Sequence, residues 1–347
     1  MEAKSGVPFP SLMSQLVLNS TGSPAEVLEL QPQSRPVPGP GEVLLRMQAA
    51  AINPADLNFI EGTYGTKPNL PCVPGMEGVG LIEELGAGVT DLTVGLAVLP
   101  LPAPGNWATW RVLPADRAHV LPEGLDFQQA ALLRVNPATA WGLLHAAGTL
   151  EAGAWVVQNA ASSAAGHCVI QLAGSLGLRT LNFVRRPESV AVCEALGGDL
   201  VFVDDAAGLA AAKAALAACG APAPLLALNA VGGDSALRLM DLLGPEGTHV
   251  TYGAMARQPL KVPNGMLIFK GLTLRGFWLT FWTTSMGAER MAEIYQKLAQ
   301  RVLSGQLRQQ IAAAYPVEQY RAALAHAAQG ARNGKIILTF QNSGLSG

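Results

Sequence analysis

Small residues and a pair of arginines follow two neighbouring apolar segments in the middle of the chain. The segment WVVQNA, residues 155–160, leads into a short turn, and the segment RTLNFV ends at Arg185 and Arg186. Unpaired backbone N–H groups at the start of a helix after such a turn can bind phosphate. Two guanidiniums after the second strand suit a 2′-phosphate, where an acidic residue would suit a 2′-hydroxyl. The pattern predicts NADPH as the cofactor, and a pair of solvated surface arginines is the alternative interpretation.

The glycine pattern of the turn is poor. Residues 159–166, NAASSAAG, contain one glycine where the dinucleotide-binding fingerprint has three. Ser162 and Ser163 can offset this by offering hydroxyl donors to phosphate. A left-handed backbone at Ala164 would cost that alanine roughly 1–2 kcal/mol. Taken alone, this turn is therefore a weak indication of nucleotide binding.

Tyr64 is a candidate general acid, because it lies in the glycine-flanked turn EGTYGTKPNLP. A phenol can donate a proton to carbon and regain it from solvent. A loop tyrosine that only packs is the alternative. The aromatic run GFWLTFW contains Phe277, Trp278, Phe281 and Trp282. Buried core explains such a run, and an apolar substrate pocket beyond a sheet strand explains it as well.

The residues that would bind a metal ion are missing from the expected segments. Zinc alcohol dehydrogenases carry a cysteine and a histidine where this chain has Asn53, in AINPADL, and Met76, in PGMEGVG. An amide and a thioether do not replace thiolate and imidazole as ligands of Zn²⁺. The four cysteines form no CxxC pair, and the five histidines are scattered along the sequence. We therefore predict that the protein uses no metal.

The composition is that of a folded protein with no affinity for nucleic acid. Half of the 347 residues are hydrophobic, 14% are charged and the formal net charge is -2, so no basic surface is expected to neutralise phosphates. The sequence has no apolar run long enough to span a bilayer. The first residues, MEAKSGVPFPSLM, lack an apolar signal core and the arginine-rich pattern of a mitochondrial leader. We expect a cytoplasmic protein.

Two kinds of element must position these groups. The first third has short apolar runs, such as EVLLRMQAAAI and GVGLIEEL, between proline and glycine turns, which indicates a β-rich, barrel-like domain. From residue 155 onward, apolar strands alternate with helical segments, which predicts a doubly wound parallel sheet. The last strand, KIILTF, is expected to return to the first domain. We predict a catalytic domain at 1–136, completed by 279–347, and an NADPH-binding domain at 137–278.

Several stretches together resemble one known family. NPADLNFIEGTYG, VNPATAW, GLRTLNFVRRPE, LALNAVGG and LIFKGLTLRGFWLTFW are similar to the mitochondrial-type 2-enoyl thioester reductases of the medium-chain dehydrogenase/reductase superfamily. The resemblance covers nearly the whole chain. It implies an α/β fold with a GroES-like β-rich catalytic domain and a Rossmann domain. It also implies a homodimer and a small-molecule substrate, which acyl carrier protein could carry.

The resemblance also implies a role for individual residues. Tyr64 corresponds to the proton donor, and Asn136 to an asparagine beside the nicotinamide and the substrate. The cofactor-binding residues that it implies are Asn136, Ser162, Ser163, Ala164, Ala165, Arg185, Arg186, Tyr252, Gly253, Ala254, Met255, Phe277, Trp278, Leu279 and Lys335. Phe281 and Trp282 would line the substrate pocket. The family's arginines are separated by an acidic residue, whereas Arg185 and Arg186 are adjacent.

The implied activity is reduction of the C=C bond of a 2-enoyl thioester. NADPH would deliver hydride to the β-carbon, donors around the site would stabilise charge on the thioester oxygen, and Tyr64 would protonate the α-carbon. An NADPH:quinone or enone oxidoreductase of the same superfamily is a first alternative. A non-catalytic protein that senses the nucleotide is a second, suggested by the poor glycine turn.

Overall fold

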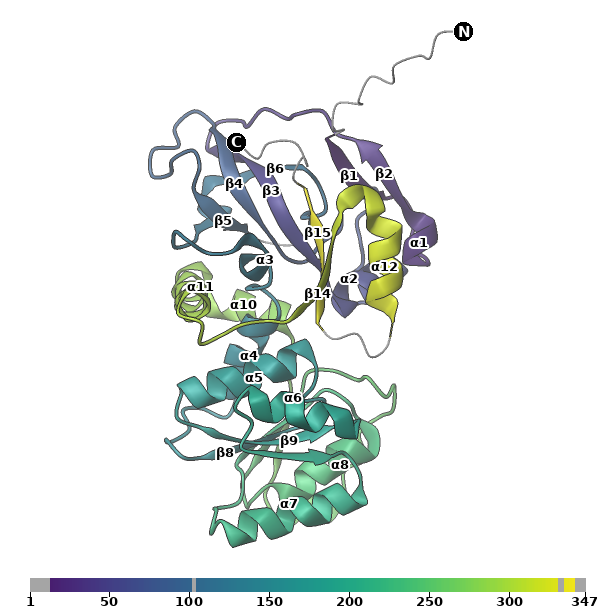
Figure 1. The fold of residues 1–347 in the computed structure, drawn as a ribbon, viewed down its shortest axis with the longest axis vertical. Helices are drawn as coiled ribbons and strands as arrows, with labels where there is room; N and C mark the ends of the chain where they lie inside the picture. Colours follow the sequence, from purple (N-terminus) through teal and green to yellow (C-terminus); the bar gives the residue numbers. More distant parts are fainter. Residues whose placement is uncertain (1–12, 102–103, 330–333, 341–347) are drawn as a thin grey trace. The chain divides into compact units, whose positions relative to one another are not determined.

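The computed structural model describes residues 13–101, 104–329 and 334–340 and forms two compact units (Figure 1). Unit 1 is Met1–Arg134 with Gln310–Gly347, and unit 2 is Val135–Gln309. The sequence-based division and this one differ mainly over residues 279–309. These residues fall in unit 2 because α10 (Leu279–Met286) and α11 (Ala288–Leu303) contact α4 (Asn136–Leu144) of the same unit.

Unit 1 is built on a seven-stranded sheet in the order β14-β15-β3-β4-β5-β7, with β6 paired to β3. Its strands are β3 (Glu42–Ile52), β4 (Gly78–Leu85), β5 (Ala97–Pro100), β6 (Trp110–Pro114), β7 (Ala118–Val120), β14 (Ile311–Pro316) and β15 (Lys335–Thr339). The C-terminal strand β15 runs antiparallel to β3, with Ile336 opposite Ile52. The two ends of the chain therefore contribute to one sheet.

The remaining elements of unit 1 are short. They are β1 (Ser14–Leu18), α1 (Pro24–Val27), β2 (Leu28–Pro32), α2 (Pro54–Glu61), η1 (Ala115–Arg117), α3 (Phe127–Ala130), η3 (Val317–Gln319) and α12 (Tyr320–Ala328). Strands β1 and β2 form an antiparallel pair. Helix α2 follows β3 directly, and Phe59 and Ile60 anchor it in the core.

Unit 2 contains a six-stranded sheet in the order β10-β9-β8-β11-β12-β13, and every pairing in it is parallel. The strands are β8 (Trp155–Gln158), β9 (Arg179–Val184), β10 (Leu200–Val203), β11 (Leu226–Asn229), β12 (Thr248–Thr251) and β13 (Thr273–Gly276). The strand order reverses between β8 and β11. The prediction of a doubly wound parallel sheet is confirmed.

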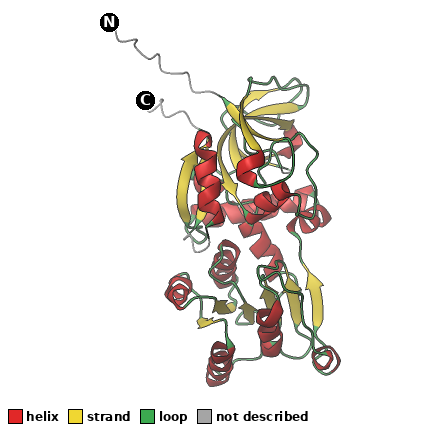
Figure 2. Cartoon of the chain, turned by 90° about the vertical axis from the view of Figure 1, so that its right-hand side faces the viewer, coloured by secondary structure: helices red, strands yellow, loops and turns green. Residues whose placement is uncertain are grey.

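Helices cover both faces of this sheet (Figure 2). Beyond α4, α10 and α11 they are α5 (Ala164–Ser175), η2 (Pro187–Ser189), α6 (Val190–Ala195), α7 (Ala206–Ala218), α8 (Gly233–Leu242) and α9 (Asn264–Ile268). Figure 1 shows α5 and α6 on one side of β8 and β9, with α7 and α8 on the other. Alternate residues of a strand point to opposite faces, so these short apolar strands can bury both.

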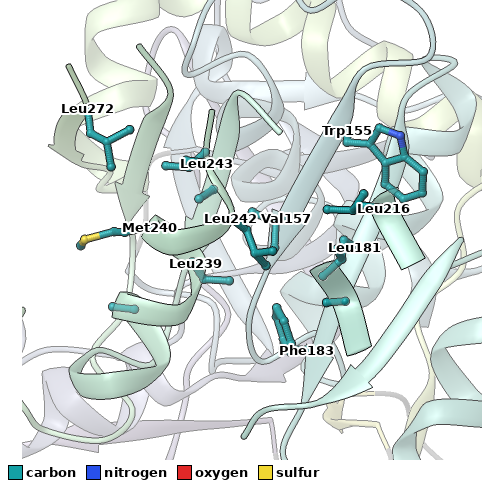
Figure 3. Packing of buried hydrophobic residues seen from close by; sticks show 13 residues of the cluster. Trp155, Val157, Leu181, Phe183, Leu216, Leu239, Met240, Leu242, Leu243 and Leu272 are labelled. Atoms are coloured by element: carbon teal, nitrogen blue, oxygen red, sulfur yellow. The ribbon is translucent and has the colours of Figure 1, made fainter. Parts of the chain in front are cut away.

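A cluster of buried apolar side chains joins the sheet to α7 and α8 (Figure 3). Val157, Leu181 and Phe183 come from adjacent strands, and Leu239 and Met240 come from α8. Their burial fixes the helix against the sheet and hence the direction in which the strands end. Within the described residues, no helix combines the length and the apolar character that crossing a membrane requires.

Candidate active site

The turn after β8 leads into the N-terminus of α5. Ser163 is the N-cap residue, and its Oγ accepts a hydrogen bond from the N–H of Gly166 over 3.1 Å. Helix α5 begins at Ala164, so Ala164 and Ala165 belong to its first turn rather than to a loop. The left-handed residue is Ala160, with φ 48°. The left-handed backbone conformation that was considered for Ala164 therefore occurs at Ala160, two residues beyond the end of β8.

Gly166 allows the turn and the helix to approach closely. A Cβ atom on Gly166 would lie 2.5 Å from the carbonyl oxygen of Ala161 and 2.7 Å from that of Ala160. Both neighbours are backbone atoms and cannot move aside as a flexible side chain can. The single glycine of this turn therefore lies where two backbone segments are too close to leave room for a side chain. The exposed Ser162 and the cap Ser163 complete a short turn with a 12-residue helix behind it.

A network of side chains fixes the strand ends where the strand order reverses. Asn159, directly after β8, donates through Nδ2 to Asn229 Oδ1 over 2.8 Å and to Ser235 Oγ over 2.7 Å. Its Oδ1 accepts from the N–H of Ala230 over 2.7 Å. Ser235 in turn donates to Asp204 after β10 over 2.5 Å. The sequence analysis did not assign these residues, although an asparagine at or directly after the end of each of two apolar strands is a signal that could have found them.

Arg185 and Arg186 differ in their surroundings. Arg186 forms an ion pair with Glu188, with Nε 3.2 Å from Oε1. Arg185, directly after β9, is exposed and has no hydrogen-bond or ion-pair partner among the described residues. Its guanidinium is available to a ligand, whereas that of Arg186 is already engaged.

The loop after β12 lies along the loop after β11. The N–H of Tyr252 donates to Asn229 O over 2.9 Å, and the N–H of Met255 donates to Ala230 O over 2.9 Å. The Tyr252 hydroxyl is buried. Burial raises the pKa of Tyr252, and Ser163 at the start of α5 partly opposes the increase. The Tyr252 hydroxyl therefore lies near the Ser163 side chain at the N-terminus of α5.

These features of unit 2 satisfy the requirements of a 2′-phosphorylated dinucleotide. The amides at the start of α5 suit its pyrophosphate. The exposed Arg185 suits its 2′-phosphate. The resemblance assigns residues 252–255 to the remainder of the cofactor, and this assignment stays a prediction.

Asn136 and the aromatic run also belong to unit 2. Asn136, the first residue of α4, donates through Nδ2 to Oε1 of the buried Gln309 over 3.1 Å. No local sequence pattern points to Gln309. The Phe277 and Trp282 rings have centroids 5.7 Å apart and pack against Gly142 of α4, where a Cβ atom would lie 2.6 Å from Phe277 Cζ.

The aromatic run spans the end of a strand and the start of a helix. Strand β13 ends at Gly276 and α10 begins at Leu279. Trp278, exposed by 38%, and Phe281, exposed by 71%, are turned outward. The structure thus packs Phe277 and Trp282 together against α4 and leaves Phe281 apart from them.

Tyr64 lies in unit 1, beyond the C-terminus of α2. Gly62 ends the helix in a left-handed conformation with φ 74°, and the N–H groups of Thr63 and Tyr64 donate to Asn58 O over 2.9 and 3.1 Å. These bonds tie the backbone of Tyr64 to a helix that is anchored in the core. The Tyr64 side chain is half-buried and within reach of solvent.

Asn53 and Met76, the residues in place of zinc ligands, have other partners. Asn53 donates through Nδ2 to Glu77 Oε1 over 2.9 Å and accepts from the Nζ of Lys335, which lies 4.0 Å from Glu77 Oε1. The backbone N–H of Met76 donates to Asp56 Oδ1 over 2.6 Å. Within the described residues, no three His, Cys, Asp or Glu side chains are grouped to hold a metal ion. Lys335, expected at the cofactor, is buried in this polar cluster of unit 1.

Asp56 links α2 to the loop that contains Met76. Its second oxygen accepts from the N–H of Asn53 over 2.8 Å. Burial raises the pKa of Asp56 to about 7, and the two backbone hydrogen bonds oppose the increase. The carboxyl group therefore fixes the start of α2 and, through that helix, the position of Tyr64.

Comparison with known proteins agrees with this architecture. Residues 39–123 match the alcohol dehydrogenase GroES-like domain, and residues 164–298 match the family described as zinc-binding dehydrogenase. The two matches cover the β-rich sheet of unit 1 and the doubly wound sheet of unit 2. They define a member of the medium-chain dehydrogenase/reductase class, as the resemblance implied.

Similar proteins with a named activity indicate to which family within this class the chain belongs. The chain is 38% identical to the rat mitochondrial enoyl-[acyl-carrier-protein] reductase over 320 residues, 91% of this chain and 85% of that protein. The solved complex of Etr1p with NADP and crotonyl-CoA is 26% identical and superposes with a TM-score of 0.84, covering 94% of this chain and 99% of the other. A Bacillus thuringiensis protein named as an NADPH:quinone reductase is 27% identical, with a TM-score of 0.86 over 94% of this chain and 98% of the other. This chain belongs to the family of the mitochondrial enoyl-[acyl-carrier-protein] reductases.

Proposed function

We propose that this protein reduces the C=C bond of 2-enoyl thioesters with NADPH. The observation that supports NADPH over NADH is the exposed, unengaged guanidinium of Arg185, directly after β9 of the Rossmann sheet. The family supports an enoyl thioester as the substrate, since the Etr1p complex contains NADP and crotonyl-CoA.

The bound cofactor supplies a hydride for the β-carbon of the substrate. The protein contributes position and electrostatics. The N-terminus of α5 and Arg185 bind the phosphates. Gln309 orients Asn136 by accepting a hydrogen bond from one of the two amide hydrogens of Asn136. The other hydrogen and the carbonyl oxygen of Asn136 remain for the reacting groups, so it can align them without reorganising.

Tyr64 donates the proton that completes the reduction at the α-carbon. The carboxyl group of Asp56 and the carbonyl of Asn58 hold its helix and its backbone. Because the side chain is half-buried, its hydroxyl can regain a proton from solvent.

An NADPH-oxidation assay across substrates tests the proposal. We expect turnover with crotonyl-CoA and little with quinones or free enones. In Tyr64→Phe, kcat should fall about 100-fold or more, in the range of general acid catalysis, with NADPH affinity nearly unchanged. Turnover of quinones without turnover of thioesters would favour the quinone reductase alternative. Wild-type kcat in Tyr64→Phe would remove this residue from the mechanism.

We also propose that the protein is a homodimer that pairs through β13. This strand is the edge of the six-stranded sheet, and its outward backbone groups can hydrogen-bond to a second copy. Beside it, Ile268 is exposed by 70% and Phe269 by 86%. Replacing Phe269 with Asp should shift the mass measured by light scattering from dimer to monomer. A monomeric wild type would refute the pairing.

The proposal includes the carrier of the acyl group and the location of the protein. The substrate is an acyl group bound to coenzyme A or to acyl carrier protein, and turnover of the same acyl group on each carrier distinguishes the two. The cytoplasmic location stays a prediction, since residues 1–12 lie outside the described residues and the curated relatives are named mitochondrial.

A further inference from the structure

Two arginines of unit 1 are held against one short loop. The side-chain amide of Asn106 donates to Gly75 O over 2.8 Å, and its Oδ1 accepts from Arg111 Nη1 over 2.5 Å. Arg134 Nη1 donates to the next carbonyl, Met76 O, over 2.7 Å. Adjacent carbonyls therefore anchor both guanidiniums, one through Asn106 and the other directly.

The loop that carries these carbonyls is well fixed. The N–H of Trp107 donates to Pro74 O over 3.1 Å, and the N–H of Met76 donates to Asp56. A Cβ atom on Gly75 would lie 2.5 Å from the Trp107 ring, so the loop and the indole are in close contact. A rigid loop holds the guanidiniums in place before any ligand arrives, which lowers the cost of binding.

Arg134 has one edge engaged by the loop and one nitrogen, Nε, that lacks a partner among the described residues. Its Nη1 is bonded to Met76 O, whereas its buried Nε has no hydrogen-bond partner among the described residues. No described carboxylate forms an ion pair with Arg134. Nε and Nη2 form the side of a guanidinium that binds two oxygens of a carboxylate or phosphate at once.

The charges around this edge favour an anion. Burial, and to a smaller extent the positive charge of Arg134, lower the pKa of Arg111 to about 10. Of the buried carboxyl groups near the loop, Glu77 contacts Asn53 and Lys335, and burial raises the pKa of Asp56 to about 7. Two neighbouring guanidiniums repel each other, and an oxyanion between them would remove the repulsion and satisfy Nε.

We propose that Arg134, with Arg111 beside it, binds an oxyanion, either a carboxylate or a phosphate. The oxyanion is carried on the substrate or is free in solution. If it is carried on the substrate, which rests on the proposed function, the preferred acyl chain ends in a free carboxylate at the end opposite the thioester. The Nε–Nη2 edge of Arg134 supplies the two parallel hydrogen bonds, and Arg111 supplies a second positive charge.

One arm of the test measures substrate choice. In the full-length protein, kcat/KM is compared for glutaconyl-CoA, which ends in a carboxylate, and for trans-2-pentenoyl-CoA, which has the same number of acyl carbons and no charge. The ratio should fall about 10- to 100-fold in Arg134→Gln, the effect of a hydrogen bond to a charged group. Arg134→Lys, which keeps the charge but loses the fork, should fall between. The exposed Arg117→Gln in the same unit is the matched control and should keep the wild-type ratio.

The other arm measures free oxyanion. Inorganic phosphate, compared with sodium chloride at equal ionic strength, should raise the Tm of the wild type and of Arg117→Gln more than that of Arg134→Gln. Repeating the pair in an Arg185→Ala background removes the phosphate site of the cofactor from the comparison.

The outcomes separate the sources and the proposals. A loss of the substrate ratio in Arg134→Gln assigns the oxyanion to the substrate, and a loss of phosphate protection alone assigns it to a free anion. Equal ratios together with equal protection in wild type and Arg134→Gln would overturn the site. If no thioester is reduced by the wild type, the proposed function fails, and the phosphate measurement still decides the oxyanion site.

Discussion

Replacing Gly166 with Ala should damage the start of α5 and weaken cofactor binding. The new Cβ would lie 2.5 Å from Ala161 O, against an ordinary contact from 3.4 Å, so turn and helix must separate by about 1 Å. Forcing extra atoms into packed structure costs about 1–3 kcal/mol. The same separation moves the amides that face the phosphates. Losing one hydrogen bond to a charged group costs about 1.5–3 kcal/mol, which is roughly 10- to 100-fold in the Kd for NADPH.

Gly174 provides a matched control in the same helix. No atom lies within 4 Å of a Cβ built on Gly174. Gly174→Ala should therefore leave the free energy of unfolding unchanged or raise it by up to about 1 kcal/mol, since alanine favours a helix over glycine. Urea denaturation gives the two stabilities, and fluorescence titration with NADPH gives the two Kd values. Wild-type NADPH affinity in Gly166→Ala would refute the argument that this close approach shapes the phosphate site.

Two further predictions concern charge in unit 2. Arg185→Ala should raise the Kd for NADPH about 10-fold or more and leave the Kd for NADH nearly unchanged. Arg186→Ala, which removes the partner of Glu188, should change the ratio of the two Kd values less. Equal losses of affinity for both nucleotides in Arg185→Ala would disprove the role of Arg185. His249 is fully buried, its two ring nitrogens have no hydrogen-bond partner among the described residues, and burial lowers its pKa from 6.5 to about 4. The unfolded chain therefore binds the extra proton first, so the stability from His249 is present above pH 6.5 and is lost as the pH falls toward 4, by about 3 kcal/mol in total. His249→Leu should remove this part of the pH dependence in urea denaturation, and identical slopes for both proteins would count against it.

The sequence determined most of the fold because its patterns are local. Apolar strands such as RTLNFV alternate with helical segments, and this order permits little besides a parallel sheet with helices on both faces. The sequence also predicted a cofactor site at the turn after β8 and at the arginines after β9, since ligand sites of such sheets lie where strands end. The limit of α10 was harder to predict, because GFWLTFW is apolar throughout and strand or helix periodicity cannot be separated in so short a run.

Tertiary structure alone decided which candidates are free to act. Arg185 and Arg186 are adjacent and chemically identical, yet packing places Glu188 against one and leaves the other open. The orientation of Asn136 by Gln309 joins residues that lie far apart in the chain, and no local pattern predicts such a pair. The same is true of Arg134, whose Nη1 is bonded to Met76 O while its buried Nε has no hydrogen-bond partner among the described residues. Residue type sets what a side chain can do, and its non-local neighbours determine which of its atoms remain available.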